Sequence, residues 1–311
     1  MKFRLNIIFI FIFILIVTLL TRVYFLSIKS NTYYEELSKR NYISKKNLVP
    51  IRGIIEDRNG KKIAINQMGF SISIKPHLRS YKNREKLDSL IAFINEQFPT
   101  LKKEELLRKY NKEDSAYNHD FVEVVDYIAY DKFFPKYTIF ASKDDIEIKS
   151  ATKRNYPYKK VASHVIGYVG RATRLDIIKN QLSEHSGIIG KNGLEKYYNK
   201  QLQGTLGFRN VKVNALNREI EILEEKKPST NNNIKTTLDI ELQKYIQEIF
   251  DYKGGAVIVM DANNGEILTA ASFPEFDNNI FAQGISVKEW NVMRNDFNHP
   301  FTNKLVNGLY P

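Results

Sequence analysis

The pattern with the plainest chemical meaning in this chain is Ser150-Ala151-Thr152-Lys153, the only place where a lysine stands three residues after a serine. On a helix, such a lysine lies beside the serine hydroxyl and can take its proton, which makes the serine a nucleophile for acyl transfer. Ile146 and Ile148 alternate with charged residues just before the pattern, and this alternation predicts a strand. In a strand, residues i and i+3 point to opposite faces. We therefore predict that Ser150 and Lys153 are not a catalytic pair.

A second pattern, Ser229-Thr230-Asn231, has the Ser-x-Asn spacing that accompanies the serine and lysine in such acyl-transfer enzymes. It lies in the polar stretch from Pro228 to Asn233, which offers no apolar wall to seat a substrate. The third pattern of these enzymes, Lys-Thr-Gly or Lys-Ser-Gly, occurs nowhere in the sequence. The residues of this chain therefore predict no catalytic site.

Metal-binding and cofactor-binding patterns are equally weak. The chain has no cysteine, which excludes thiolate ligands, thiol nucleophiles and disulfides. Its five histidines lack the spacing of metal ligands: His77, His119, His164, His185 and His299. Gly187, Gly190 and Gly193 precede a predicted helix but lack the Lys-Ser/Thr ending of a phosphate-binding loop, so we interpret them as backbone turns. We predict no metal and no cofactor.

The N-terminus predicts a membrane helix. Residues 7 to 20 contain thirteen Ile, Leu, Phe or Val side chains, interrupted only by Thr18. At roughly −0.3 to −0.6 kcal/mol each, these side chains favour insertion by about 5 kcal/mol, which outweighs the cost of Arg22 near the far end. Ser27-Ile28-Lys29 is a poor cleavage site, so we expect Ile7–Leu20 to be an uncleaved lipid-embedded anchor rather than a signal peptide.

The charges around this segment bear on its orientation. Lys2 and Arg4 precede it without an acidic residue, which favours a short tail on the cytoplasmic side and the bulk of the chain outside. Basic residues after the segment argue for the opposite orientation: Lys29, Lys39, Arg40, Lys45 and Lys46. Large domains, however, cross a membrane largely regardless of charge. We predict a single-pass protein of the cytoplasmic (inner) membrane with its soluble part outside.

The net charge of +12 and the isoelectric point near 9.4 would suit a nucleic-acid partner. The sequence has no long Lys/Arg run, no zinc-finger spacing and no RNA-binding aromatic motif, so we predict no nucleic-acid binding. A solvated lysine-rich surface is the simplest interpretation, and anionic lipid headgroups or anionic polymers outside the membrane are the alternative partners.

Between the anchor and residue 236 the sequence predicts a mixture of helices and strands. Pro50 to Gly60 is expected to be a strand that enters an Asn-Gly turn and returns through residues 61–66. Arg52, Asp57 and Arg58 are interpreted as an interdomain set of ion pairs with a structural rather than a catalytic role. The other predicted strands are Phe70–Ile74, Phe121–Val125 and Tyr137–Ile148; the predicted helices are Asn83–Phe98, Leu101–Tyr110, Leu175–Leu182 and Leu194–Gln201. Ile234–Thr237 is expected to cross between domains.

The last third begins with a predicted helix, Ile240 to Phe250, capped by Asp239. Its apolar residues recur at helical spacing: Leu242, Tyr245, Ile246, Ile249 and Phe250. Two short apolar runs, 256–260 and 267–272, follow and are joined through Asn264-Gly265. Because asparagine and glycine tolerate positive φ, we predict an antiparallel hairpin with a type I′ turn.

This order of elements resembles the opening of the penicillin-binding transpeptidase domain. The resemblance rests on residues at the positions of that family's motifs: Thr237, Leu238, Asp239, Leu242, Gln243, Gly255, Ala256, Asp261, Gly265, Glu266, Ile267, Leu268, Ser272, Pro274, Asp277, Asn279, Asn303, Tyr310 and Pro311. Thr269 stands where alanine is usual. In the family, the nucleophilic serine comes within a few residues of the Tyr-Pro pair, so we expect this chain, as given, to end before its S-x-x-K motif and to be inactive.

The preceding region resembles the family's non-catalytic pedestal, or dimerisation domain. Five blocks carry this resemblance: Arg52-Gly53-Ile54-Ile55 with Asp57-Arg58-Asn59-Gly60, Arg154 with Tyr156-Pro157, His164 to Gly170, Gly190 to Glu195, and Tyr198, Leu202, Gly204 and Gly207. The form His-Val-Ile-Gly-Tyr-Val-Gly-Arg is more similar to penicillin-binding protein 2, the elongation branch of the class B penicillin-binding proteins, than to the division paralogue.

The resemblance implies an α+β fold in three parts. We expect a cytoplasmic tail and transmembrane anchor at residues 1–28, a pedestal at 29–235 and the start of a transpeptidase domain at 236–311. It further implies a peptidoglycan D,D-transpeptidase that cross-links stem peptides and binds penicillin, and that works beside a SEDS-family glycosyltransferase and other elongation proteins. The alternatives are a non-catalytic membrane-anchored scaffold of the elongation machinery and a non-functional gene remnant.

Overall fold

The computed structural model describes residues 2–25, 42–80, 83–116, 120–180, 182–213, 219–229, 232–250 and 254–308. His119, Thr230, Asn231 and the pair Tyr310-Pro311, which figured in the sequence-based predictions, lie outside these residues. The chain divides into two compact units, one of residues 1–46 and 208–226 and one of residues 47–207 and 227–311. The boundaries predicted at residues 28/29 and 235/236 stay predictions.

The first unit contains the predicted apolar helix, α1 (Lys2–Tyr24). Within it, Asn6–Tyr24 is long and apolar enough to cross a membrane, with a mean hydropathy of 2.7. Its large apolar side chains are exposed on every face, which suits a helix surrounded by lipid rather than a helix packed on a protein core. The unit also holds a three-stranded sheet in the order β1-β8-β9, with bounds Ile43–Leu48, Gly207–Val213 and Glu219–Lys226.

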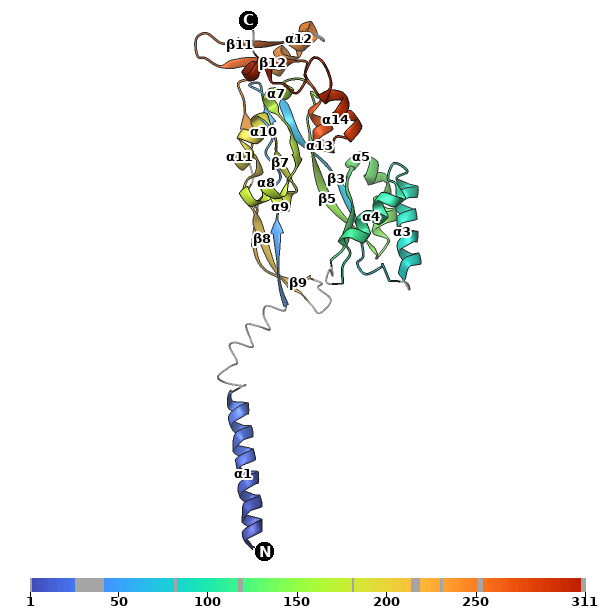
Figure 1. The fold of residues 1–311 in the computed structure, drawn as a ribbon, viewed down its shortest axis with the longest axis vertical. Helices are drawn as coiled ribbons and strands as arrows, with labels where there is room; N and C mark the ends of the chain where they lie inside the picture. The colour runs from blue at the N-terminus through green and yellow to red at the C-terminus, as the bar shows by residue number, and fades with distance from the viewer. Residues whose placement is uncertain are drawn as a thin grey trace. The chain divides into compact units, whose positions relative to one another are not determined.

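A second sheet organises the other unit around one long strand, β3 (Figure 1). Its strands are β2 (Ile55–Glu56), β3 (Lys62–Ile74), β4 (Val122–Ala129), β5 (Ile146–Asn155) and β10 (Ile234–Lys235). β5 runs antiparallel to β3 from Ile65↔Asn155 to Ile74↔Ile146. β10 pairs in parallel with β2, so the segment expected to cross between domains is itself a strand of this sheet.

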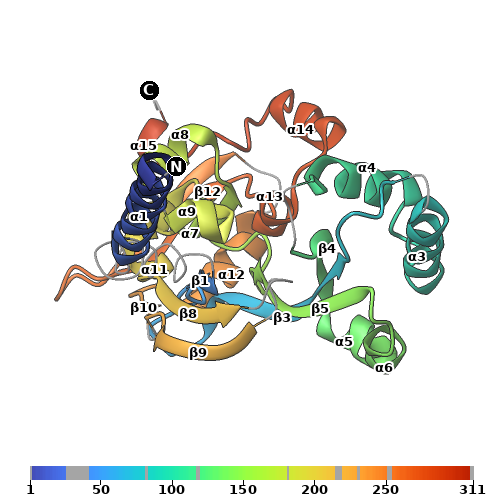
Figure 2. The same ribbon diagram turned by 90° about the horizontal axis from the view of Figure 1, so that it is seen from below.

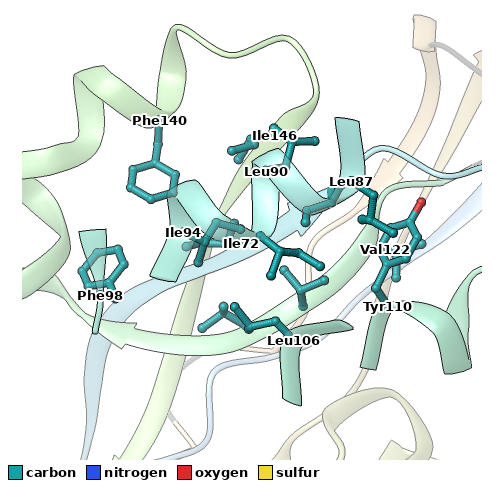
Figure 3. Packing of buried hydrophobic residues seen from close by; sticks show 14 of the residues in the cluster. Ile72, Leu87, Leu90, Ile94, Phe98, Leu106, Tyr110, Val122, Phe140 and Ile146 are labelled. Atoms are coloured by element: carbon teal, nitrogen blue, oxygen red, sulfur yellow. The ribbon is translucent and has the colours of Figure 1, made fainter. Parts of the chain in front are cut away.

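Two predicted helices form part of this unit: α3 (Arg84–Gln97) and α4 (Lys103–Glu113). α4 lies beside β4, and α3 lies beside α4 (Figure 2). The apolar face predicted for residues 83–98 is confirmed, because Leu87, Leu90, Ile91 and Ile94 are buried. They pack with Ile72, Phe98, Leu106, Tyr110, Val122, Phe140 and Ile146 in the larger core (Figure 3). The helical period of 3.6 residues places all four on one side of α3.

The extended segment predicted at Tyr137–Ile148 is wrong over its first half. Residues 130–141 form α5 (Tyr130–Phe133), a 3₁₀ turn (Phe134–Lys136) and α6 (Tyr137–Ala141). Phe140 is fully buried there, with its ring 5.2 Å from that of Phe133 and 4.9 Å from that of Phe93. Packing of these aromatic rings decides the local structure, although aromatic residues favour strands by propensity alone.

Short elements make up the remainder of the pedestal: α7 (Ser163–Ile166), β6 (Val169–Arg171), α8 (Arg174–Lys179), α9 (Leu182–Ser186), β7 (Ile188–Gly190), α10 (Gly193–Tyr197) and α11 (Asn199–Gln203). β6 and β7 pair antiparallel. The helix predicted at Leu175–Leu182 ends at Lys179, and the one predicted at Leu194–Gln201 is two helices separated at Tyr198.

The C-terminal segment contains α12 (Ile240–Phe250), β11 (Gly255–Met260), β12 (Ile267–Phe273), α13 (Asn278–Gln283), α14 (Val287–Arg294) and α15 (Lys304–Asn307). The hairpin of β11 and β12 is confirmed, but the type I′ turn is wrong. Among the residues of its loop only Gly265 has a positive φ, of 75°. The loop is longer than two residues: the Gly265 N–H donates to the Asp261 carbonyl, and the Asp261 carboxylate accepts from the Asn263 N–H.

The apolar face predicted for α12 is only partly buried. Ile246 packs against Ala271 and Phe273 of β12. Tyr245 and Ile249, however, are 59% and 57% exposed. The period of the sequence identified the helix correctly, but only one side of it meets the hairpin.

Candidate functional site

The centre of the pedestal is a buried carboxylate held between two arginines. Glu195, on α10, accepts from Arg52 Nε at 2.8 Å through Oε2 and from Arg154 Nε at 2.7 Å through Oε1. Arg52 precedes β2 and Arg154 lies near the end of β5, so three elements that are distant in sequence meet at one carboxylate. All three side chains are at most 5% exposed. We call Arg52, Arg154 and Glu195 the arginine centre.

Charge pairing keeps the arginine centre ionised. Burial alone would raise the pKa of Glu195, but the guanidinium groups of Arg154 and Arg52 outweigh it and hold that pKa below its ordinary value. Burial lowers the pKa of Arg52, against the opposing effect of Glu195. A carboxylate between two guanidiniums stays charged under these conditions, and each partner removes part of the cost of burying the other.

The hydrogen-bond network extends from the arginine centre in two directions. On one side, Arg52 Nη1 donates to Asn199 Oδ1 at 3.0 Å, and Asn199 Nδ2 donates to Gln203 Oε1 at 2.8 Å. On the other side, the Tyr156 hydroxyl donates to Glu195 Oε1 at 3.1 Å and accepts from the Val169 N–H at 3.0 Å. Burial raises the pKa of Tyr156 far above its ordinary value, so this hydroxyl stays protonated.

The main chain of Tyr156 connects this network to the C-terminal segment. Asn279, on α13, accepts from the Tyr156 N–H at 2.8 Å and donates to the Tyr156 carbonyl at 2.9 Å. One amide side chain thus satisfies both main-chain groups of a buried residue, as a neighbouring strand would. Asp277 caps α13 by accepting from the Asn279 N–H at 2.9 Å, and it also accepts from Asn279 Nδ2 at 2.9 Å, which orients the Asn279 side chain.

A second asparagine makes the next contacts along this junction. Asn278 is fully buried and donates from Nδ2 to the carbonyls of Gly167 at 2.8 Å and Ser163 at 3.3 Å. The Phe276 N–H donates to Ser163 Oγ at 3.3 Å. Residues 273–283 are therefore held against the stretch from Tyr156 to Tyr168 by main-chain and amide hydrogen bonds. We call this contact the junction.

Aromatic rings pack around these hydrogen bonds. Tyr168 stacks on Phe281, with ring centroids 4.2 Å apart, and Phe276 meets the His164 ring edge-on at 5.0 Å. Phe301 lies 5.6 Å from Phe276 and 5.8 Å from Phe281. Such pairs add stabilisation beyond the burial of their area.

The junction also contains ionisable groups that no partner satisfies. Both carboxylate oxygens of Glu275 and both ring nitrogens of His164 are buried without a hydrogen-bond partner. Burial raises the pKa of Glu275 to about 8, an effect that the nearby main chain of Ala162 and Ser163 offsets only in part. Burial, with a contribution from Lys304, lowers the pKa of His164 to about 4. Both groups are therefore neutral at pH 7.

The sequence patterns that suggested chemistry lie elsewhere. Ser150 is exposed on β5, and the strand predicted for Ser150 and Lys153 is confirmed. Ser229 Oγ accepts from the Thr205 N–H at 2.7 Å, as expected of a linker residue. The absence of a catalytic or metal site stays a prediction.

Two of the three glycines before the predicted helix, Gly187 and Gly193, have positive φ, whereas Gly190 is the last residue of β7. Gly193 has a φ of 57°, and a Cβ on Gly190 would lie 1.9 Å from the Glu195 carbonyl oxygen. This close approach lets β7 pack against α10 and places Glu195 in the arginine centre. The interpretation as backbone turns therefore agrees with the structure for Gly187 and Gly193 and is wrong for Gly190.

Of the interdomain ion-pair set predicted for Arg52, Asp57 and Arg58, only Arg58 pairs with a residue of the 236–311 segment, and the three residues have separate partners. Arg52 pairs with Glu195, and Arg58 lies 3.5 Å from Glu266. The Asp57 carboxylate instead accepts from the N–H groups of Asn59 and Lys61 and organises the turn before β3. Arg52 precedes β2, whereas Asp57 and Arg58 follow it, so proximity in sequence did not indicate the partners.

Sequence reasoning also missed the roles of Tyr156, Glu195, Asn278 and Asn279. Arg154, Tyr156, Glu195 and Asn279 occur in the family's motifs, which was the available signal, but no spacing in the sequence joins them. Tyr156 and Asn279 are 123 residues apart.

Comparisons with known proteins place this arrangement in a family. Residues 47–236 match the model of the family described as the penicillin-binding protein dimerisation domain. The structure is similar to that of penicillin-binding protein 2 in its complex with MreC from Helicobacter pylori, with a TM-score of 0.78 and 42% identity, covering 86% of this chain and 50% of that chain.

Curated relatives agree. The peptidoglycan D,D-transpeptidase MrdA of Escherichia coli K12 is 32% identical over 97% of this chain and 48% of its own length. The protein of the same name from Haemophilus influenzae is 30% identical over 97% of this chain and 46% of its own length. The chain spans about half the length of the curated relatives that it matches.

Proposed function

Because this chain belongs to the penicillin-binding proteins that carry a dimerisation domain, we propose that it is the N-terminal part of a peptidoglycan D,D-transpeptidase of the elongation type. The observation that carries the proposal is the likeness of both the pedestal and the first elements after it to penicillin-binding protein 2 from Helicobacter pylori. Fold alone does not establish an activity, but identity above 40% over most of the chain supports a shared one.

The reaction proposed for the whole protein is an acyl transfer. A serine hydroxyl attacks the carbonyl of the penultimate D-alanine of a stem peptide, and the peptide bond to the terminal D-alanine breaks. That D-alanine leaves with the proton, and the amine of a neighbouring stem then attacks the serine ester. The new cross-link forms and the serine hydroxyl is restored, so the reaction needs no cofactor.

The part of this chain in that reaction is to position the transpeptidase domain. The junction attaches α13 to the pedestal through Asn278 and Asn279, and Tyr156 connects it to the arginine centre. A rigid support of this kind sets where the first elements of the domain lie relative to the pedestal, and catalytic groups need placement to within about 0.5 Å.

The activity is tested by labelling the full protein that the gene encodes with a fluorescent penicillin. A covalent band on denaturing electrophoresis, together with D-alanine release from stem peptides, is the expected result. The 311-residue chain alone should give no fluorescent band. A full protein that is never labelled, yet still co-purifies with the elongation machinery, would favour the scaffold.

The membrane arrangement is part of the proposal. α1 is long and apolar enough to span once, and we place the N-terminus inside and the pedestal outside. Protease added to the outer face of spheroplasts should digest everything but the anchor. Full protection of the pedestal would reverse the assignment.

The partners proposed are other proteins of the elongation machinery. The relative from Helicobacter pylori was solved as a complex with MreC, which supports an MreC-type partner for this chain as well. A SEDS-family glycosyltransferase is the second proposed partner, beside α1 in the membrane. Co-purification of each protein with this chain from detergent extracts tests them separately.

A further inference from the structure

Buried polar atoms without a partner are concentrated at the junction. Seven such side-chain atoms occur among the described residues, and six of them belong to junction residues or to the strand that leads into it: His164, Thr269, Glu275 and Asn278. The seventh, Arg154 Nη2, is in the arginine centre. Native proteins leave very few buried polar groups unpaired, so this concentration distinguishes the junction from the rest of the described chain.

Glu275 is the most exceptional of these residues because it can carry a full charge. It is 9% exposed and stands between β12 and α13, at the start of the residues that contact α7. A buried carboxylate is stable as an ion only when a cation or several hydrogen-bond donors compensate it. Within the described part of the chain, Glu275 has no ion pair, and neither carboxylate oxygen has a hydrogen bond of standard geometry. The main chain of Ala162 and Ser163 and the side chain of Gln243 are near enough to lower the pKa of Glu275, but they offset the effect of burial only in part.

The charged groups of the elements packed around Glu275 are engaged elsewhere. Asp277 caps α13. Lys304, on α15, donates from Nζ to the carbonyl of Asn298 at 3.0 Å. Lys159 is exposed, and the Arg154 guanidinium is paired with Glu195. His164, on α7, is buried without a partner and is neutral at pH 7. No positive charge on the described residues of these elements makes an ion pair with Glu275.

We propose that Glu275 makes the junction sensitive to protons: its carboxyl group is accommodated only in the neutral form, and its ionisation detaches residues 273–283 from α7. The hydrogen bonds that break on detachment are those of Phe276 with Ser163 and of Asn278 with Gly167. The proposal depends only on interactions within this chain and holds whether or not the proposed enzymatic function does.

The sign of the effect follows from proton linkage. The pKa of Glu275 rises from an ordinary value of 4.5 to about 8 on folding, so the folded chain binds a proton that the unfolded chain has released. Stability that depends on Glu275 is fully present below pH 4.5 and is lost as the pH rises toward 8. Detachment of the junction is therefore expected on the alkaline side of neutrality.

The single tryptophan of the chain provides the readout. Trp290 stacks on Phe301 at 5.0 Å, and Phe301 in turn contacts Phe276 and Phe281 of the junction. For the full chain in a non-ionic detergent, we expect Trp290 emission to shift to longer wavelength between pH 6 and 9, with a midpoint near 8. Glu275→Gln, which is neutral at every pH, should keep its pH 6 spectrum throughout.

Glu96→Gln is the matched control, because Glu96 is exposed on α3, and it should titrate like the parent chain. A parent chain whose emission is constant from pH 6 to 9, or a Glu275→Gln variant with the same alkaline midpoint, would overturn the proposal.

If Glu275→Gln lacks the circular-dichroism spectrum of a folded protein, infrared spectroscopy of the parent chain tests the proposal instead. A carbonyl band of a protonated carboxyl group should be present at pH 6 and disappear with a midpoint near 8. Its absence at pH 6 would overturn the proposal.

Discussion

The arginine centre and the junction are adjacent and equally buried, yet they handle charge in opposite ways. In the arginine centre, Glu195 is ionised because two guanidiniums donate to it. At the junction, Glu275 and His164 have no charged partner and are neutral at pH 7. Tyr156 and Asn279 connect the two regions. Burial alone therefore does not set protonation; the charged and hydrogen-bonding groups around the side chain do.

The largest expected effect is at the arginine centre. Glu195→Gln preserves shape but leaves two buried guanidiniums without a carboxylate, so we expect a loss of about 3–5 kcal/mol in the free energy of unfolding. Urea unfolding of the detergent-solubilised chain at pH 7 measures it. The exposed change Glu96→Gln should stay within about 0.5 kcal/mol. If Glu195→Gln also changes the free energy of unfolding by no more than about 0.5 kcal/mol, other groups compensate the charge of the two arginines.

A pH-dependent effect of opposite sign to that of Glu275 is expected for His164. Its pKa falls from 6.5 to about 4 on folding, so the unfolded chain binds a proton first and stability is lost as the pH falls from 6.5 toward 4. At 1.36 kcal/mol per unit, the loss amounts to about 3 kcal/mol. His164→Gln should remove this slope, and His185→Gln, at an exposed position, should keep it. Equal slopes in both variants would contradict the assignment.

A smaller effect is expected where the two regions are joined. Asn279→Ala leaves the buried Tyr156 N–H without a partner and removes one of two donors to the Tyr156 carbonyl, which still accepts from the Lys159 N–H, at a cost of about 2 kcal/mol. The same urea experiment measures it. Asn291→Ala, on the exposed face of α14, is the control. A cost as small as that of the control would show that Asn279 does not hold the junction.

The smallest effect is expected for Tyr156→Phe. The change removes a donor to Glu195 and an acceptor for the Val169 N–H, while two arginines still neutralise the carboxylate. We expect a loss of about 1 kcal/mol, with Tyr127→Phe, at a more exposed hydroxyl, near zero. A loss as large as that of Glu195→Gln would mean that the tyrosine, rather than the arginines, stabilises the carboxylate.

Local periodicity predicted much of the fold. Leu87, Leu90 and Ile94 recur at helical spacing and are buried on α3, and the alternation at Ile146 and Ile148 correctly placed Ser150 on a strand. Prediction failed at Tyr137–Ala141, where contacts with Phe93 and Phe133 stabilise a helix in an aromatic stretch. It also failed at the Asn264-Gly265 turn, because Asp261 organises a longer loop.

The apolar anchor, the amphipathic helices, many of the strands and the family follow from the order of the amino acids, because each depends on residues close together in the chain or on contiguous motifs. The buried ion pair of Arg52 and Glu195, which are 143 residues apart, and the lack of an ion pair at Glu275 among the described residues are seen only in the folded chain. Apolar burial follows a local repeat, whereas a hydrogen bond needs two groups within about 3 Å, which local spacing does not encode.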